Sequence, residues 1–251
     1  MKNNNRQLAR IFSRRDVLAL FRAAATAILV VGCIPRKSSS TLAKSSVASA
    51  TLPACVVSPE QTEGPYFVDE KLNRSDIRPE PADGSVKPGT PLHLTLHISQ
   101  VGSTGCTPLA GAIVDVWHCD ALGVYSDVAD RSFNTVGQKF LRGYQVSDAN
   151  GTVEFTTIYP GWYQGRTVHI HFKVRTDGTS EQGYEFTSQL YFDDLITDEV
   201  HSQTPYASKG QRTQKNADDG IFTDGGEQML LKLTKNGQGY AGTFDVGLKI
   251  T

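Results

Sequence analysis

The sequence predicts an all-β fold, an antiparallel β-sandwich with long loops and little helix. Short segments in which apolar and polar residues alternate recur along most of the chain, as in strands with one buried face. Clusters of Gly, Asn, Asp and Pro separate them, such as Ser147–Gly151, and these residues favour turns. No long segment has the apolar spacing of an amphipathic helix, so a sandwich of antiparallel sheets is the expected architecture.

The strand pattern is plainest in its first segment, Leu92–Ile98. Leu and Ile side chains alternate there with His93, Thr95 and His97, so one face of the strand is expected to be buried. The only predicted helix is a short one over residues 193–202. The predicted strands are residues 92–98, 112–117, 141–146, 152–158, 167–174, 187–192, 228–234 and 240–250.

The amino-terminal residues resemble an export signal rather than part of the fold. Basic residues precede an apolar run from Ala23 to Gly32, which is too short to span a bilayer. Ser13–Leu18 matches a twin-arginine signal, and Val30–Cys33 resembles a lipobox, whose cysteine is acylated in bacterial lipoproteins. We therefore expect a signal over residues 1–33, a flexible tether over residues 34–52 and a folded domain over residues 53–251.

The expected location follows from that signal. We expect an exported protein, periplasmic or at the cell surface, that is lipid-anchored through Cys33 and has no other membrane contact. A plain secreted protein cleaved after a small residue is the alternative.

Charge and cysteine content narrow the remaining choices. The formal net charge is −1 and there is no basic patch, which argues against nucleic acid as a partner. Cys55 and Cys106 lie in proline-flanked loop sequence, and a disulfide between them is permitted outside the cytoplasm, but the sequence leaves their pairing open. Cys119 is expected to be a buried free thiol. The acid-rich run Asn216–Gly220 lacks the spacing of a calcium loop and is interpreted as a turn.

His169 and His171 are the most informative pair of residues. Side chains two apart on a strand point to the same face, so both imidazoles would lie opposite an apolar face that includes Val168 and Ile170. A shared metal ion is the commonest way to satisfy two such histidines. The alternative is a strand with two solvent-facing histidines.

Tyr125 and Tyr163 are further candidate ligands, because both lie in predicted turns near that strand. Alone, each tyrosine is more often a packing aromatic. Nitrogen and oxygen donors without thiolate or carboxylate suit a hard trivalent ion, and Fe(III) is the expected metal. Such an ion would also lower the pKa of the phenols by direct attraction.

Four stretches, in order along the chain, together resemble the intradiol ring-cleavage dioxygenases, especially the protocatechuate 3,4-dioxygenase branch. They are Glu60–Tyr66, Val116–Ser126, Tyr159–Tyr163 and Arg166–Phe172. The resemblance spans about residues 55–250, which makes the folded domain a catalytic sandwich.

The resemblance implies a site and a reaction. One mononuclear non-haem Fe(III) would be bound by Tyr125, Tyr163, His169 and His171. Arg166 would lie against the bound catechol ring, and Gln189 would be a polar residue of the pocket. The expected substrates are a small catecholic aromatic and O2, and the ring would open between its hydroxylated carbons to a muconate-type product.

A charge count agrees with that reaction. Fe(III) with a hydroxide, two tyrosinates and two neutral histidines sums to zero, and uncompensated charge in a buried site is costly. An arriving catechol dianion should therefore displace the hydroxide and one tyrosinate. The resemblance assigns the displaced ligand, which then acts as a base, to Tyr163.

Two other functions remain open from the sequence. Residues 108–117, 147–155 and 160–163 also resemble prealbumin-like sandwich modules, many of which only bind or space, so an exported non-catalytic binding or structural module is the main alternative. A zinc hydrolase of the same geometry is less well matched, since zinc sites favour Cys, His and carboxylate. The motifs determine neither the accepted catechol nor the oligomeric state.

Overall fold

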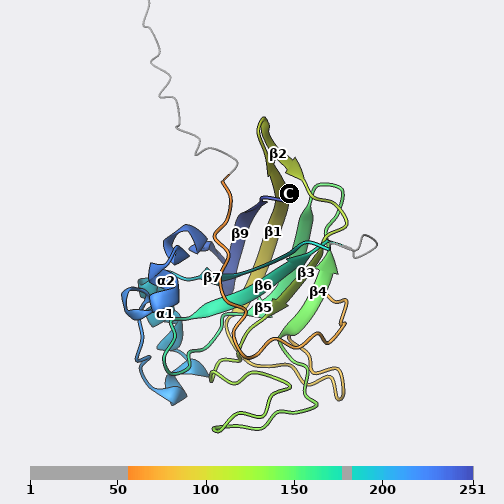
Figure 1. The fold of residues 1–251 in the computed structure, drawn as a ribbon. Coiled ribbons are helices and arrows are strands. Elements are labelled where there is room, and N and C mark those ends of the chain that lie inside the picture. Colours follow the sequence, from red (N-terminus) through yellow and green to blue (C-terminus); the bar gives the residue numbers. More distant parts are fainter. Residues whose placement is uncertain (1–55, 177–182, 251) are drawn as a thin grey trace, which may run out of the picture. The chain divides into compact units, whose positions relative to one another are not determined.

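The computed structural model describes residues 56–176 and 183–250, which form two facing sheets with short helices beside them (Figure 1). The predicted all-β sandwich with little helix is confirmed. The predicted signal and tether, residues 1–52, lie outside the described residues. The elements in chain order are β1 (Pro91–Gly102), β2 (Gly105–Pro108), β3 (Ile113–Trp117), β4 (Arg142–Val146), β5 (Thr152–Ile158), β6 (His169–Arg175), β7 (Glu185–Tyr191), α1 (Asp194–His201), η1 (Tyr206–Lys209), η2 (Asn216–Asp218), α2 (Gly220–Thr223), η3 (Gly226–Met229), β8 (Lys232–Asn236) and β9 (Gly239–Leu248).

The two sheets differ in how their strands pair. One sheet has the order β4-β3-β6-β7, and all its pairs are antiparallel. In the other, β1 pairs with β5 and β2 along one edge and with β9 along the other, and β8 lies beyond β9. Among the named strands of the described residues, β1 and β9 form the single parallel pair, which joins the first strand to the last.

The predicted elements match the observed ones best where the alternation is regular. The strand predicted over residues 152–158 is β5 with the same bounds. The strand predicted over residues 228–234 begins only at Lys232, because residues 226–229 form the 3-10 helix η3. The sequence did not predict β2, which is short, largely exposed and without apolar alternation. The predicted helix over 193–202 is α1, and the Asp193 side chain caps it.

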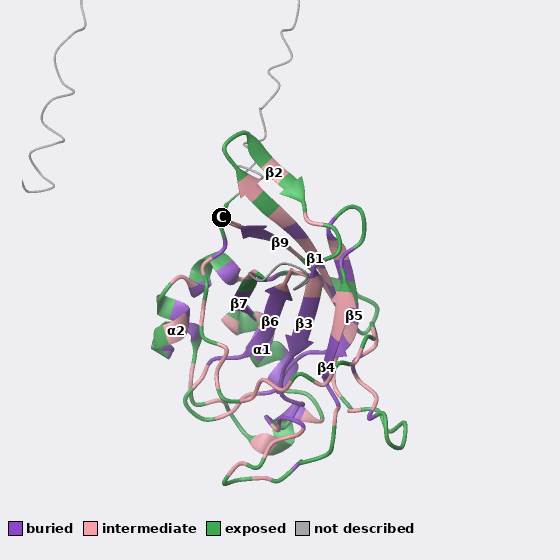
Figure 2. Cartoon of the chain, turned by 45° about the vertical axis from the view of Figure 1, so that its right-hand side comes forward, coloured by how far each residue is buried: buried purple, intermediate pink, exposed green. Residues whose placement is uncertain are grey.

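Strand β6 is buried on both faces, and this decides where a site can lie (Figure 2). Ile170, Phe172 and Val174 pack into the core between the sheets. The opposite face carries His169 and His171, each only 2% exposed, so the solvent-facing alternative for these histidines is wrong.

A loop segment, residues 56–72, covers that outer face. The Gln61 N–H donates to the Thr187 carbonyl of β7, and Glu63 forms an ion pair with Lys173 of β6. The histidine pair therefore lies between the sheet and this segment. None of the helices in the described ranges is long and apolar enough to span a membrane.

Two cysteines, Cys106 and Cys119, lie in the described part of the chain. Cys119 is a buried free thiol, as predicted. Cys106 is disulfide-bonded. Cys55, whose pairing with Cys106 the sequence leaves open, and the expected acylation site Cys33 lie outside the described residues.

Candidate functional site

The histidine side chains bring two ring nitrogens to one point. Nε2 of His169 lies 3.0 Å from Nε2 of His171. Nδ1 of His169 lies 2.7 Å from the Thr167 carbonyl, which can only accept, so Nδ1 carries the proton and Nε2 keeps its lone pair. Two ligands about 2.1 Å from one ion and at right angles to each other lie about 3 Å apart. The observed separation therefore suits a shared metal ion.

Burial keeps both imidazoles neutral. Desolvation, with the nearby charge of Arg166, lowers the pKa of His169 to about 3. Desolvation, with the neighbouring His169, lowers the pKa of His171 well below its ordinary value. Neutral imidazoles are the form that binds a metal. The His171 ring is also held by Trp117, which stacks on it at 4.9 Å with an interplanar angle of 7°.

The two predicted tyrosine ligands lie beside this pair. The Tyr163 hydroxyl is 3.2 Å from Nε2 of His169. The Tyr125 ring lies 5.7 Å from that of Tyr163 and 6.4 Å from that of His171, between centroids. The structure thus brings together all four side chains predicted as metal ligands.

Two of the candidate ligands carry a buried polar atom that lacks a hydrogen bond. The Tyr125 hydroxyl and Nδ1 of His171 have no hydrogen-bond partner among the described residues. Leaving a buried hydroxyl without a partner costs roughly 1–3 kcal/mol. A metal ion bound by the Tyr125 oxygen would remove that cost for the tyrosine, so this orphaned atom fits a metal site.

The phenols also indicate what kind of ion fits. Burial, with a contribution from Tyr163, raises the pKa of Tyr125 well above 10. Burial also raises the pKa of Tyr163, although the charge of Arg166 opposes it. Both phenols would stay protonated unless a strongly positive ion lay against them. The converging donors are two imidazoles and two phenols, without a thiolate or carboxylate, and this set suits a hard trivalent ion better than zinc.

The loops that carry the two tyrosines pack backbone against backbone. The Gly161 N–H donates to the Asp120 carbonyl at 3.1 Å, and a Cβ on Gly161 would lie only 2.5 Å from that oxygen. Gly123, with φ +78°, approaches the Trp162 carbonyl group in the same way. Glycine at both positions is what allows the two loops to approach this closely.

Tyr66 covers the Tyr125 ring. The two rings stack with centroids 4.5 Å apart, and the Tyr66 hydroxyl donates to Asp130 at 2.9 Å. Burial and the hydrogen bond to Asp130 raise the pKa of Tyr66 to about 12, so this phenol is neutral. Tyr66 therefore packs against a candidate ligand.

Arg166 and Gln189, the two predicted substrate-side residues, contact each other. Nη2 of Arg166 donates to Oε1 of Gln189 at 2.6 Å, and Nε2 of Gln189 donates to the Thr62 carbonyl at 2.8 Å. The β6–β7 register places Gln189 directly beside His171. The guanidinium is thus held next to the four candidate ligands.

Comparisons with known proteins agree with this geometry. A family model described as "Dioxygenase" matches residues 62–219. The solved structure of an intradiol ring-cleavage dioxygenase from Tetranychus urticae aligns with a TM-score of 0.67 at 32% identity, over 78% of this chain and 95% of that one. The chain belongs to the intradiol ring-cleavage dioxygenase family.

The curated sequence relatives cover the chain less completely. The protocatechuate 3,4-dioxygenase beta chain of Burkholderia cepacia is 31% identical over 177 residues, which cover 66% of this chain and 68% of the relative. A chlorocatechol 1,2-dioxygenase of Pseudomonas sp. (strain P51) is 34% identical over 104 residues, which cover 34% of this chain and 38% of the relative. The chain spans 38% to 49% of the length of three matched relatives, namely this chlorocatechol dioxygenase, a second one and a catechol 1,2-dioxygenase.

One residue of the candidate site, Asp219, was not predicted from the sequence. Nε of Arg166 donates to Asp219 at 2.8 Å, and the Asp219 side chain is almost fully buried. The sequence places Asp219 in a run interpreted only as a turn. An aspartate before Gly-Ile-Phe does match a helix N-cap, but no local pattern shows which cation lies against it.

Proposed function

We propose that this protein is an Fe(III)-dependent intradiol dioxygenase. It would insert both atoms of O2 into a small catecholic aromatic and open the ring between the two hydroxylated carbons to a muconate-type product. The observation that carries the proposal is the convergence of two neutral buried imidazoles and two phenols, one of them without a hydrogen-bond partner among the described residues, in a chain of this family.

The four converging side chains, Tyr125, Tyr163, His169 and His171, would hold the iron. A ferric ion bound there would supply a Lewis-acidic anchor for the two catechol oxygens and draw electron density from the ring. The fixed tautomer of His169 and the stacking of Trp117 on His171 orient both nitrogen ligands in advance.

The surroundings of the two tyrosines support different roles for them. Tyr125 is 1% exposed and is enclosed by Trp117, Cys119 and Tyr66, so it would stay in place. Tyr163 is only partly buried and lies in a loop between β5 and β6. Its side chain, as a phenolate, can therefore swing aside and accept the proton of one catechol hydroxyl, which makes it a neutral phenol.

Arg166 supplies positive charge where the reaction builds negative charge. Because Gln189 holds one edge of its guanidinium, the charge is in place before substrate arrives. Preorganised charge of this kind stabilises an electron-rich ring as it takes up a carbanion-like, ketonised form. Gln189 is fully buried and fixed by Thr62, so it would act by orienting Arg166 and by excluding water.

Oxygen uptake by the purified, iron-loaded protein with catechol, protocatechuate and hydroxyquinol tests the proposal. We expect consumption of one O2 per ring, with both atoms of 18O2 found in one ring-opened product. The iron-loaded protein should be wine-red, and anaerobic addition of the accepted catechol should change that absorption as one tyrosinate leaves. A colourless protein that binds no iron and consumes no oxygen would instead support the non-catalytic sandwich module.

We also propose that the enzyme is exported and lipid-anchored through Cys33. The twin-arginine and lipobox patterns support this, as does the disulfide bond of Cys106, which suits an oxidising compartment. Mass spectrometry of the mature amino terminus should find an acylated Cys33. An unmodified terminus formed by cleavage elsewhere would show that the protein is simply secreted.

A further inference from the structure

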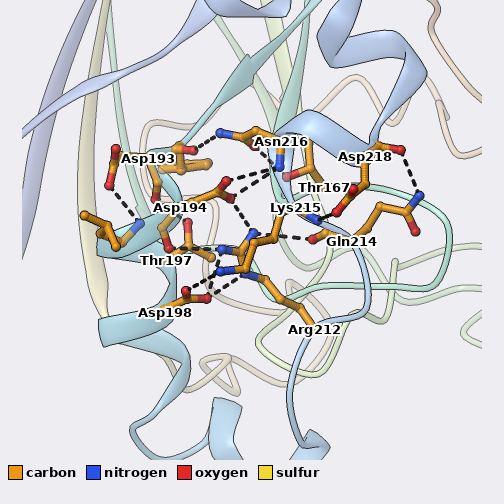
Figure 3. Close-up of polar contacts among 12 residues, drawn as sticks. Thr167, Asp193, Asp194, Thr197, Asp198, Arg212, Gln214, Lys215, Asn216 and Asp218 are labelled. Carbon is orange, nitrogen blue, oxygen red and sulfur yellow. Dashed lines mark hydrogen bonds and ion pairs between the residues drawn. The ribbon is translucent and has the colours of Figure 1, made fainter.

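The segment between η1 and α2 reaches from the helical side of the molecule to the candidate active site. Arg212 donates to Asp194 at 2.6 Å and to Asp198 at 2.9 Å, which fixes the start of the segment to α1 (Figure 3). The Arg212 side chain is only 3% exposed, whereas the side chains of Asp194 and Asp198 are 29% and 44% exposed. The start of the segment is therefore attached to α1 through a buried guanidinium.

Asn216, farther along, attaches the segment to the active-site strand. Its Nδ2 donates to the Phe192 carbonyl at 2.8 Å, and its Oδ1 accepts from the Thr167 hydroxyl at 2.6 Å. Figure 3 shows Asn216 between α1 and Thr167. This places Asp219, three residues later, against the turn that leads into β6.

Asp219 accepts four hydrogen bonds there. Oδ2 accepts from Nε of Arg166 and from the Thr167 N–H, both at 2.8 Å. Oδ1 accepts from the N–H groups of Ile221 at 2.8 Å and Phe222 at 3.2 Å, which caps α2. Burial by itself raises the pKa of Asp219, but the Thr167 N–H and the charge of Arg166 bring it below the ordinary value, so the group is a carboxylate.

Both groups that donate to Oδ2, Arg166 and the Thr167 N–H, belong to residues that contact the candidate site. Nη2 of the same guanidinium donates to Gln189, so Arg166 is hydrogen-bonded to two partners. Thr167 presents its carbonyl to Nδ1 of His169, and this bond determines which nitrogen of His169 is free. One carboxylate oxygen thus fixes the position of a cation and of a ligand-orienting carbonyl.

We propose that Asp219 is a positioning residue of this enzyme, which holds the Arg166 guanidinium and the Thr167 backbone in their working places. This inference rests on the proposed dioxygenase function. Asp219 does not touch the candidate metal ligands and acts through its two neighbours.

The test compares Asp219→Ala with Asp148→Ala in the iron-loaded full-length protein. Asp148 also accepts two backbone N–H bonds in a turn, from Asn150 and Thr152, but lies in the β4–β5 turn away from the site. We expect Asp219→Ala to lower kcat about 10- to 100-fold, since misplacing a group by an ångström costs that much, with KM changed less than about threefold. Asp148→Ala should keep kcat.

Two further measurements separate positioning from loss of folding. In an Arg166→Ala background, Asp219→Ala should lower kcat by a smaller factor than in the wild type, because one of the two groups through which it acts is gone. Hydrogen–deuterium exchange should be at least about tenfold faster at residues 164–168 in Asp219→Ala and unchanged there in Asp148→Ala. Asp219→Asn keeps the side-chain volume and should give a smaller loss of kcat, should the alanine variant not fold.

An unchanged kcat in Asp219→Ala, a loss that adds fully to that of Arg166→Ala, or unchanged exchange at residues 164–168 would overturn the inference. Failure of the proposed function is distinguishable from these results. If the wild-type protein consumes no oxygen with any catechol, the dioxygenase proposal fails. The exchange measurement then still decides whether Asp219 holds this turn.

Discussion

Replacing Gly161 by alanine should separate the two tyrosine-bearing loops and weaken iron binding. A Cβ at this position would lie 2.5 Å from the Asp120 carbonyl oxygen, and it would also meet the Ala121 carbonyl oxygen. Real Cβ contacts essentially never fall below 3.0 Å, so the two loops must part by about 0.5 Å or more. Both contacts are with backbone, which cannot turn aside as a side chain can.

The consequence for the site follows from how tightly it is built. Metal ligands must be held within about 0.5 Å of their productive positions, so a loop shift of this size is as large as the displacement that the site can accept. Overpacking of this kind costs about 1–3 kcal/mol of folding stability. We expect Gly161→Ala to fold with a lowered Tm, to bind iron at least about tenfold more weakly and to lose part of its tyrosinate-to-iron absorption.

Gly102→Ala is the matched control. A Cβ on Gly102 would lie 3.5 Å from the nearest heavy atom, the Gly105 carbonyl oxygen, which is an ordinary contact. Neither Gly102 nor Gly161 has the positive φ that would strain an alanine. Iron content, the visible spectrum and thermal unfolding are measured for both variants. If Gly161→Ala binds iron with the stoichiometry and spectrum of the wild type, the close approach of the two loops does not set the ligand geometry.

Three further outcomes are expected. Tyr125→Phe should lose iron and colour, as metal analysis would show. Tyr163→Phe should keep more iron but turn over roughly 10- to 100-fold more slowly, as measured by oxygen uptake. Equal iron loss in the two variants would contradict a fixed ligand role for Tyr125 and a base role for Tyr163. His118 is neutral and doubly hydrogen-bonded, and desolvation lowers its folded pKa to about 4 against an unfolded value of 6.5. The folded state then binds fewer protons, so stability falls as the pH drops from 6.5 to 4, by roughly 3 kcal/mol, and denaturant unfolding of His118→Gln should lack that part of the pH dependence. Removing iron with a chelator should lower the Tm by about 8–16 °C for an ion present at roughly 1,000 times its Kd, whereas an unchanged Tm would argue against a resident ion.

The fold was predictable where burial follows a simple period. In β5 and β1 one face packs into the core and the other is at least partly exposed, so alternation reveals the strand. In β6 both faces are buried, and the polar residues of its outer face lie beneath residues 56–72. The alternation in β6 therefore predicts the strand, but it does not predict that residues 56–72 cover its outer face. The 3-10 helices and β2 carry no strong local pattern, since tertiary packing rather than propensity holds them.

The candidate ligands were predictable because their chemistry is rare and local. His169 and His171 share one strand face by the geometry of any strand, and the tyrosines occur in motifs that the family uses. Asp219 was not predictable, because its contact with Arg166 spans 53 residues. A carboxylate in a turn looks the same in sequence whether it faces water or a buried guanidinium.

By itself, the sequence determined the all-β class, most strand positions and the donor types of the site, since these depend on side-chain period and on the intrinsic chemistry of imidazole and phenol. Only the tertiary structure decided that the histidine face is covered, that two glycines bring the tyrosine loops together, and that Asp219 holds Arg166. Those features arise from contacts between distant segments, and the free energy of such contacts depends on burial and distance, which no local stretch of sequence contains.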